Sequence, residues 1–351
     1  MTAADHGGGA SEVLLRLENV TKHFPVPGTG WFGRGAAQVH AVDGVSLEVH
    51  RGETLGLVGE TGCGKSTLAR CVARLYDLTG GSITFGGDDI SRLSRRAMRP
   101  YRRDIQMIFQ DPYGSLNPRR RVGSIIGDPF VIHRTDSRIA RRHRVQELME
   151  VVGLNPEHYN RFPADFSGGQ RQRVGVARAL ALQPKLVICD EPISALDVSI
   201  QAQILNLLAD LQDEFGLTYL FSAHDLSVVQ HVSDRIAVMY LGHVVEVADT
   251  DELVHRPRHP YTNALLAAIP VPDPELADRR EQPSLCGDMP SPIHPPTGCR
   301  FHPRCPKAGP RCAEEEPAPA PRLGDGAGHV AACHHPVAAD EQLDLTKDGA
   351  A

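Results

Sequence analysis

One glycine-rich segment constrains the fold of this chain more than any other part of its sequence. It reads Gly59-Glu60-Thr61-Gly62-Cys63-Gly64-Lys65-Ser66-Thr67. The apolar run Leu55–Val58 precedes it, and helical spacing over Leu68–Leu75 follows it. A strand, a glycine-rich loop and a helix in this order form a phosphate-binding loop, because glycine lets backbone N–H groups curl around a phosphate. We predict that Lys65 contacts the β and γ phosphates of a nucleoside triphosphate and that the Ser66 hydroxyl ligates Mg²⁺.

A second apolar run ends in two adjacent carboxylates. Its sequence is Leu186-Val187-Ile188-Cys189-Asp190-Glu191. A buried strand of this kind directs Asp190 toward the shell of the Mg²⁺ ion, and it places Glu191 to polarise an attacking water. Such a pair is unremarkable alone. Downstream of a phosphate-binding loop, it indicates hydrolysis of the bound triphosphate.

Short apolar segments alternate with helical ones over most of the chain. Strands are predicted at Leu14–Val20, Val42–Val49, Leu55–Val58, Leu186–Cys189 and Leu217–Ser222. Helices are predicted at Leu68–Leu75, Ser124–Leu154, Gln172–Leu182 and Ile204–Leu211. This alternation is typical of an α/β fold with a mostly parallel sheet. The Gly/Pro-rich stretch Pro25–Gln38 is predicted to be a surface loop.

The charge of the chain argues against nucleic acid as a partner. The net charge is −6, which gives no general electrostatic attraction to a polyanion. Basic residues nevertheless gather in Ser91–Arg103, which contains six arginines. That stretch is either a solvated helical face or a contact surface for an acidic partner.

The composition is that of an ordinary soluble globular protein, with 41% hydrophobic and 23% charged residues. No uncharged apolar run approaches the roughly 20 residues that cross a bilayer. The first ten residues lack the basic and apolar pattern of a signal peptide. We therefore expect a cytoplasmic location, with disordered ends at residues 1–11 and 338–351.

Five of the eight cysteines fall at Cys286 or beyond, in a segment where proline is dense. Four of them follow the pattern Cys299-x5-Cys305-x6-Cys312-x20-Cys333. This loop-rich segment has too few apolar residues for a sizeable core of its own, and a metal would supply cross-links. The spacing lacks the CxxC pairs of a structural zinc site, and four thiolates also suit a [4Fe–4S] cluster.

Three alternatives therefore stay open for these four cysteines: a [4Fe–4S] cluster, zinc, or free or oxidised thiols. Nearby histidines are possible substitute ligands, namely His302, His334 and His335. Cys286 lies outside the pattern and is predicted to be a bystander. Cys63, inside the phosphate-binding loop, is expected to make ATP binding sensitive to thiol-modifying reagents.

Five further motifs follow the phosphate-binding loop in a fixed order. They are Gln110 in Ile108-Phe109-Gln110-Asp111, the segment Phe166-Ser167-Gly168-Gly169-Gln170, the pair Asp190-Glu191, Asp197 in Ser194-Ala195-Leu196-Asp197, and His224 in Ser222-Ala223-His224-Asp225. With this set in this order the chain resembles the ATP-binding cassette (ABC) proteins. The resemblance implies a P-loop NTPase cassette, with a mixed-sheet core plus a helical subdomain, that uses ATP and Mg²⁺.

The resemblance also implies a role for each residue in hydrolysis. Gln110 contacts Mg²⁺ and the attacking water, and it shares the metal with Ser66 and Asp190. His224 contacts the γ-phosphate and helps to hold Glu191 and the water in line. The presence of both Glu191 and His224 argues against a regulatory cassette that binds ATP without turnover.

Other residues of the resemblance face the nucleotide or a second cassette. The signature segment Ser167–Gln170 closes over the γ-phosphate bound to the opposite cassette, chiefly through Ser167 and Gly169. Asp197 belongs to the loop that links the two cassettes. Phe24 stands where the family stacks an aromatic ring on adenine, although Trp31 or Phe32 could take this place.

Longer segments narrow the resemblance to one kind of cassette. They are Asp111–Pro118, Phe166 at the start of the signature, Cys189–Gln203 and His259–Leu266. Together they resemble the ATPases of dipeptide/oligopeptide importers, and in particular the second of the two paired ATPase subunits. Nickel and glutathione importers share most of these motifs. Soluble non-transport cassettes usually carry two fused cassettes or a long coiled-coil insertion, and the sequence has neither.

The resemblance implies an organisation and a set of partners. The cassette is expected at residues 12–255, with a helical subdomain at about 111–182, and the C-terminal module with its four cysteines at 256–337. Expected partners are two permease subunits, a sister ATPase and, indirectly, an extracytoplasmic peptide-binding protein. The chain would then lie at the cytoplasmic face of the membrane. The matching cysteine pattern in these ATPases is associated with a [4Fe–4S] cluster.

Overall fold

The computed structural model describes residues 12–26, 37–111, 113–269, 287–321, 328–338, 341 and 343. Some predicted features lie outside these residues: the end at residues 1–11, all but three positions of 338–351, most of the loop within Pro25–Gln38 including Trp31 and Phe32, and Cys286. None of the helices in the described part of the chain is long and apolar enough to span a membrane.

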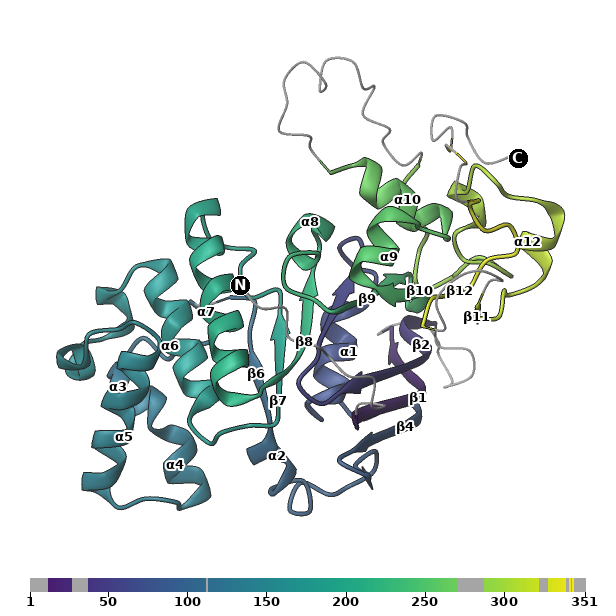
Figure 1. Cartoon of the computed structure of the whole chain (residues 1–351). Helices are drawn as coiled ribbons and strands as arrows, with labels where there is room; N and C mark the ends of the chain where they lie inside the picture. Colours follow the sequence, from purple (N-terminus) through teal and green to yellow (C-terminus); the bar gives the residue numbers. More distant parts are fainter. Residues whose placement is uncertain are drawn as a thin grey trace, which may run out of the picture.

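Two sheets form the centre of the molecule (Figure 1). The larger has the order β11-β12-β10-β9-β3-β8-β7-β6 within the described residues. Its strands are β3 (Thr54–Val58), β6 (Ile105–Ile108), β7 (Leu186–Asp190), β8 (Thr218–Ala223), β9 (Arg235–Tyr240), β10 (His243–Asp249), β11 (Ala320–Pro321) and β12 (Val330–Ala331). Strands β6, β7, β8, β3 and β9 pair in parallel, and the remaining pairs are antiparallel. The prediction of an α/β fold with a mixed sheet is confirmed.

The smaller sheet is antiparallel, with the order β2-β1-β4-β5. Its strands are β1 (Val13–Pro25), β2 (Gln38–His50), β4 (Gly80–Phe85) and β5 (Asp88–Asp89). The register of β1 against β2 places His23 opposite His40 and Phe24 opposite Val39. This sheet therefore brings residues from both ends of the predicted surface loop together.

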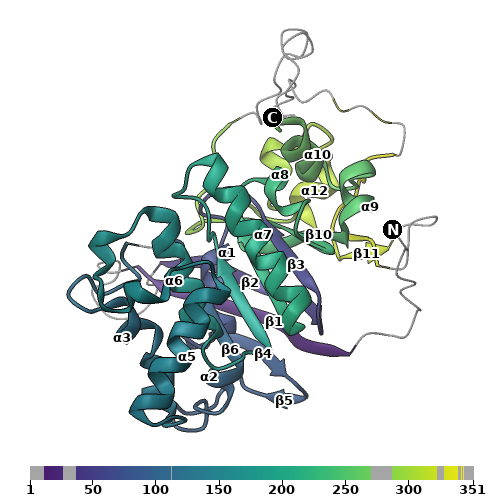
Figure 2. The same ribbon diagram turned by 60° about the vertical axis from the view of Figure 1, so that its left-hand side comes forward.

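Helices connect the two sheets and cover the parallel strands. Helix α1 (Lys65–Val72) contacts strands of both sheets, as the rotated view in Figure 2 shows. Helix α7 (Val198–Phe215) ends at Gly216, whose φ of 62° is the left-handed conformation that glycine favours at a helix end. The short helix α8 (Leu226–Val229) follows β8. All residues of β3, β7 and β8 are buried, as expected for strands covered on both faces.

The helical end of the molecule differs from the single long helix predicted at Ser124–Leu154. The structure has three helices there, α3 (Val122–Ile126), α4 (Asp128–His133) and α5 (Arg138–Val151). Pro129 has no N–H for a continuous helix, and Arg134 ends α4 in the left-handed conformation with φ 56°. The side chain of Ser137 then caps α5 by accepting from the N–H of Ala140.

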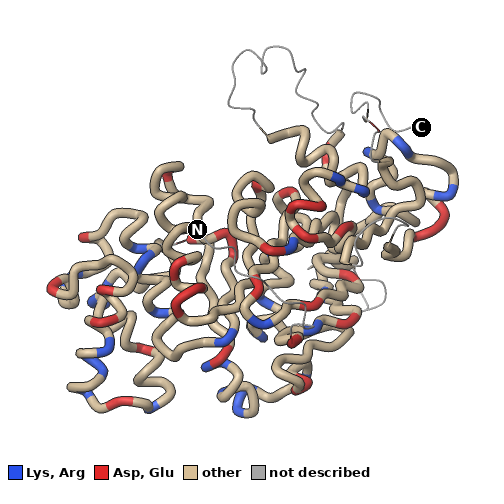
Figure 3. Tube along the Cα trace, viewed as in Figure 1, with Lys and Arg blue, Asp and Glu red and all other residues tan. Residues whose placement is uncertain are grey.

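The remaining elements of this end are short, apart from α6. They are α2 (Tyr101–Asp104), the 3-10 helices η1 (Pro156–Asn160) and η2 (Pro163–Asp165), and α6 (Gly168–Leu180). The arginines of Ser91–Arg103 are all exposed, and most precede α2 in turns rather than in a helix. Arg99 donates to the carbonyl of Ile132 at 2.8 Å, so this basic stretch contacts the end of α4. Over the described residues as a whole, positive and negative side chains are interspersed (Figure 3).

The C-terminal module is joined to the main sheet. It follows α9 (Thr250–His255) and contains α10 (Pro260–Ala267), η3 (His302–Arg304), α12 (Pro310–Glu314) and strands β11 and β12. Strand β12 pairs with β10, and the buried carboxylate of Glu246 in β10 accepts from the N–H groups of Arg258 and His259 and contacts His329 Nε2 at 2.7 Å. A buried carboxylate needs such partners, so this contact anchors the module.

Candidate nucleotide-binding site

The predicted phosphate-binding loop joins β3 to α1. Its conformation needs glycine: Gly64 has φ 113°, and a Cβ there would come within 2.1 Å of the carbonyl oxygen of Ala41. Gly62 has φ 86°. Because these residues carry no side chain, the backbone before α1 turns tightly enough to present successive N–H groups beside the helix N-terminus.

Lys65 is the first residue of α1, and its side chain is only 3% exposed. Its ammonium group donates to the carbonyl of Gly59 at 2.6 Å and to that of Glu60 at 3.2 Å. It also lies 3.6 Å from a carboxylate oxygen of Glu191. The lysine is thus held over the loop that it is predicted to serve.

Glu191 lies beside the two other predicted catalytic side chains, Gln110 and His224. Gln110 donates from Nε2 to Glu191 Oε2 at 2.8 Å, and His224 Nδ1 lies 3.9 Å from the same oxygen. Glu191 has φ 45°, a left-handed conformation that non-glycine residues rarely adopt. Its N–H donates to the carbonyl of Ser222 at 3.1 Å. Strained backbone of this kind concentrates at functional sites.

Asp190 offers a test of whether the site suits Mg²⁺. Its side chain is fully buried, and its Oδ2 has no hydrogen-bond partner within the described residues. The nearest cation there is Arg70, whose Nη2 is 3.7 Å away. Because a buried carboxylate oxygen requires a partner, the donor set of Asp190, Gln110 and Ser66 fits a hard divalent cation.

Lys65, Ser66, Gln110, Glu191 and His224 line one cavity of about 800 Å³, and the buried Asp190 is not part of its lining. Its lining comprises Phe24, Val39, Ala41, Thr61, Gly62, Gly64, Lys65, Ser66, Thr67, Gln110, Asp111, Glu191, Ser194, Ala195, His224 and Pro292. The volume is within the range of sites for cofactors and nucleotides. Phe24 stacks edge-on against Tyr76, with ring centroids 5.4 Å apart, at the side of the cavity formed by β1 and β2.

The structure keeps the signature segment away from this cavity. Ser167, Gly168, Gly169, Gln170 and Asp197 are all absent from its lining. Ser167 caps α6: its Oγ accepts from the N–H of Gln170 at 3.3 Å, and the Gln170 side chain accepts from the N–H of Ser167 at 3.0 Å. The segment therefore forms a capped helix N-terminus outside the cavity that Lys65 lines.

Cys63 is less reactive than its place in the loop suggested. The side chain is 1% exposed, and burial raises the pKa of its thiol. Because the thiolate is the reactive form, a buried thiol with a raised pKa reacts slowly at neutral pH. The expected sensitivity to thiol-modifying reagents is therefore opposed by the structure.

The four cysteines of the C-terminal pattern gather in one place. Each of Cys299, Cys305 and Cys333 has a pKa raised first by burial and then by the charges of other members of the set, Cys312 among them. The pKa values of Cys305 and Cys333 rise to about 12. The N–H of Cys299 donates to the carbonyl of Cys312 at 2.8 Å. All four thiols lie in the described part of the chain and are free. No three of their sulfur atoms lie within 4.8 Å of one another, although the charges of the other three each raise the pKa of Cys333.

Two of the possible substitute ligands contact backbone carbonyls through one ring nitrogen each. His302 Nδ1 lies 2.9 Å from the carbonyl of Cys299, and His334 Nε2 lies 2.9 Å from the carbonyl of Glu315. His335 Nε2 approaches Gly309, where an added Cβ would meet it at 3.3 Å. The second ring nitrogen of each of these histidines takes no part in these contacts, so the three residues stay possible ligands.

One group of metal-ligating residues went unnoticed in the sequence. The donor atoms of His23, His40 and Asp43 lie within 4.8 Å of one another. Asp43 also contacts the guanidinium of Arg300 and the ring of His243. Hydrogen bonds from His243 first, and then from Arg300, His40 and His23, hold the pKa of its carboxyl far below the usual range. The strand register that pairs His23 with His40 is the signal that could have revealed the group. Arg300 makes it a junction between β2 and the C-terminal module.

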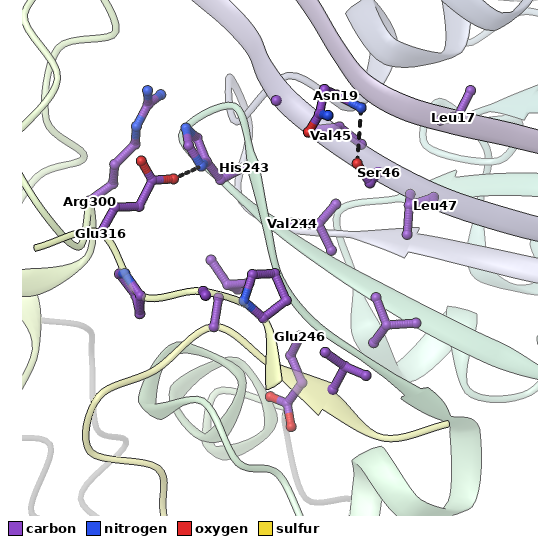
Figure 4. A pocket seen from close by; sticks show the side chains of 18 of the residues that line it. Leu17, Asn19, Val45, Ser46, Leu47, His243, Val244, Glu246, Arg300 and Glu316 are labelled. Carbon is purple, nitrogen blue, oxygen red and sulfur yellow. Dashed lines mark hydrogen bonds and ion pairs between the residues drawn. The ribbon is translucent and has the colours of Figure 1, made fainter. Parts of the chain in front are cut away.

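A second cavity, of about 940 Å³, lies between the antiparallel sheet, β10 and the C-terminal module (Figure 4). His243 and Glu316 form an ion pair at its rim, with 2.9 Å between His243 Nδ1 and Glu316 Oε1. None of the predicted nucleotide-site residues lines it. The predicted nucleotide chemistry therefore belongs to the smaller cavity, whereas Cys299 of the cysteine pattern lines the larger one.

Two family models match the chain. Residues 42–194 match the family described as "ABC transporter". Residues 245–312 match "Oligopeptide/dipeptide transporter, C-terminal region". The first match contains the phosphate-binding loop and Glu191, and the second contains three of the four patterned cysteines.

Curated proteins and solved structures resemble the chain over most of its length. The oligopeptide transport ATP-binding protein AppF of Bacillus subtilis (strain 168) is 52% identical, over 95% of this chain and 99% of that protein. The dipeptide transport ATP-binding protein DppF of Escherichia coli (strain K12) is 48% identical, over 91% and 93%.

Among solved structures, a dimeric ATP-binding cassette in a post-hydrolysis state with ADP and Pi has a TM-score of 0.60 and 29% identity, covering 68% of this chain and 99% of that one. The cbiO1 subunit from Clostridium perfringens, part of an ABC transporter complex, has a TM-score of 0.60 and 26% identity, covering 70% and 92%. The fold, the converging site and these relatives agree, and the chain belongs to the ABC transporter family, among the oligopeptide and dipeptide transport ATP-binding proteins.

Proposed function

We propose that this chain is the ATP-hydrolysing subunit of an importer for dipeptides or oligopeptides. The observation that carries the proposal is the meeting of Lys65, Gln110 and His224 around Glu191 in one cavity. The matched C-terminal region and the names of the relatives favour peptides over nickel or glutathione as the imported substrate. They also favour a transporter over a non-transport ATPase.

Hydrolysis at this site consists mostly of positioning and charge stabilisation. Glu191 accepts from Gln110 and would orient the attacking water. Lys65 would move from the loop carbonyls to the phosphates. His224, with an exposed side chain, would approach the γ-phosphate. Mg²⁺, when bound to Ser66, Gln110 and Asp190, would neutralise charge that develops on the phosphates.

We propose that the complete site needs two cassettes. The signature residues Ser167 and Gly169 lie outside this chain's own cavity, and a related cassette has been solved as a dimer. Placed on a sister ATPase, the N-terminus of α6 would close over the nucleotide of that subunit, and Asp197 would lie in the linking loop. ATP would then favour the closed pair, and hydrolysis the open one.

The proposed position is the cytoplasmic face of the membrane, beneath two permease subunits. Exposed apolar side chains of the helical end would contribute to the contact, among them Tyr113, Ile132 and Ile139. Gln110 lies where the catalytic cavity meets this end, and would transmit permease contact to Glu191. An extracytoplasmic binding protein would deliver the peptide to the permeases.

Transport by the reconstituted complex tests this function. We expect proteoliposomes with the chain, its sister ATPase and the permeases to hydrolyse ATP several-fold faster when the peptide-loaded binding protein is added. Lys65→Ala should remove this stimulation because the phosphates lose their main cation. If Ni²⁺ or glutathione stimulated the ATPase and peptides did not, the proposed substrate would be wrong. If the permeases did not change the ATPase activity, the transport role would be wrong.

We also propose that Cys299, Cys305, Cys312 and Cys333 bind a [4Fe–4S] cluster. Their proximity, their partial burial and the preference of iron–sulfur clusters for four thiolates support it. The cluster would cross-link a segment that has few regular elements. Zinc is the alternative, since it also accepts four thiolates.

Metal content distinguishes these alternatives. Anaerobic purification should give a brown protein with about four iron atoms per chain. Cys305→Ser should lower the iron content, because a ligand is lost. Cys286→Ser is the matched control, since this cysteine lies in the same segment but outside the pattern, and it should keep the iron. A colourless protein with one zinc ion would contradict the cluster.

A further inference from the structure

A single arginine connects the C-terminal module to the phosphate-binding loop. Arg304 lies in η3, and its side chain is only 6% exposed. Its Nη1 donates to both carboxylate oxygens of Glu60, at 3.0 and 3.2 Å. Glu60 belongs to the loop and precedes Arg304 by 244 residues. Hydrogen bonds between charged groups of low exposure are among the stronger ones in proteins.

A second contact reaches the same residue of the loop. The backbone N–H of Glu60 donates to the hydroxyl of Tyr261 at 2.9 Å. Tyr261 is fully buried and packs against Tyr240 and Phe301, with ring centroids 4.7 and 5.4 Å away. Because this aromatic group is close-packed, the tyrosine hydroxyl has a fixed position from which to hold the loop.

The third contact of Glu60 leads to the phosphate-binding lysine. The carbonyl of Glu60 accepts from Lys65 Nζ at 3.2 Å and from the N–H of Cys63 at 3.2 Å. All three polar parts of Glu60 are therefore engaged: the N–H by Tyr261, the carboxylate by Arg304 and the carbonyl by Lys65. The loop conformation on which the lysine depends is fixed partly from outside the cassette.

We propose that Arg304, together with Tyr261, is a positioning residue for ATP binding: it holds the phosphate-binding loop in shape from the C-terminal module through Glu60. Neither residue touches the reacting atoms. Loss of Arg304 should therefore weaken binding of substrate and transition state alike, which raises KM without changing kcat. The inference concerns the nucleotide site only, and it does not require that the four cysteines hold a cluster.

The test measures ATP binding and turnover in Arg304 variants of the full-length chain. We expect Arg304→Met to raise the Kd for a fluorescent Mg²⁺–ATP analogue about tenfold, the scale of one partly buried charged hydrogen bond. In the reconstituted complex the KM for ATP should rise similarly, with kcat within twofold. Arg304→Lys, which keeps the charge, should recover most of the affinity.

A double-mutant cycle identifies Glu60 as the residue through which Arg304 acts. In a Glu60→Ala background the carboxylate that pairs with Arg304 is already missing. Arg304→Met should therefore raise the Kd for the ATP analogue less than threefold in that background. An undiminished effect of Arg304→Met in that background would overturn the proposal. The proposal would also be wrong if the Arg304→Met variant unfolded at the wild-type temperature and bound ATP with wild-type affinity.

Arg311 supplies the matched control. Like Arg304, it immediately precedes one of the patterned cysteines, but it is exposed and pairs with Glu315, the residue that follows its own helix. Arg311→Met should leave the ATP affinity unchanged. Measuring iron in every variant separates this inference from the cluster: if Arg304→Met lost both iron and ATP affinity while Arg304→Lys restored only the iron, the positioning role would be wrong.

Discussion

Glu191→Gln is expected to stop ATP turnover in the reconstituted complex, with a loss of at least about 100-fold in kcat. The substitution keeps the size of the side chain and an oxygen that can accept from Gln110. It removes the negative charge that polarises the water and would accept its proton. Lys65 and the loop glycines are untouched, so ATP should still bind and should hold the two cassettes together. Size-exclusion chromatography with Mg²⁺–ATP should show a long-lived cassette pair.

Glu214→Gln is the control for this experiment. Glu214 is exposed in α7 and does not line the cavity. The Glu214→Gln variant should therefore hydrolyse ATP at the wild-type rate. Near-wild-type hydrolysis by Glu191→Gln would remove Glu191 from its proposed role. Hydrolysis lost together with ATP binding would show instead that the substitution damages the loop.

Ser167→Arg should have the second large effect, at the site of the partner. The signature residue is proposed to face the nucleotide of the sister cassette, where a bulky side chain would keep the pair from closing. We expect the isolated chain to bind ATP normally, while turnover of the complex falls by about 100-fold. Equilibrium binding and steady-state turnover on the same preparations measure the two quantities.

Ser167 also caps a helix, and that second role has its own control. Ser137 caps α5 in the same manner, with 3.3 Å between its Oγ and the N–H of Ala140. Loss of either cap should reduce the free energy of unfolding by about 1 kcal/mol. Ser137→Arg should lower the free energy of unfolding by this amount and leave the ATP turnover of the complex unchanged. Equal turnover losses in the two variants would mean that Ser167 acts only as a cap.

Local sequence patterns predicted those parts of the site whose geometry is set by neighbouring residues in the chain. The order of apolar run, glycines and Lys65 specifies a strand, a loop and a helix, which is what the structure has from β3 to α1. The apolar run before Asp190 likewise predicted a buried strand. The prediction of one long helix at Ser124–Leu154 was wrong. It followed the apolar spacing and did not take account of Pro129, which lacks the N–H that a continuous helix needs there.

Contacts between distant segments could not be predicted. Arg304 and Glu60 are 244 residues apart, and nothing in either local pattern indicates the other. The pairing of His23 with His40 depends on the register of β1 and β2 across the intervening loop. The burial of Cys63, which reverses its expected reactivity, follows from close packing and not from the loop motif.

The pairing of β12 with β10 has a consequence for how the chain is made. A ribosome completes the cassette motifs by His224, but Val330 of β12 and His329, the partner of Glu246, emerge about a hundred residues later. At roughly 5–20 residues per second, that interval lasts several seconds or more. During it the edge of β10 is unpaired and open to other strands. Until β12 is made, this edge of β10 is a place at which the nascent chain can aggregate.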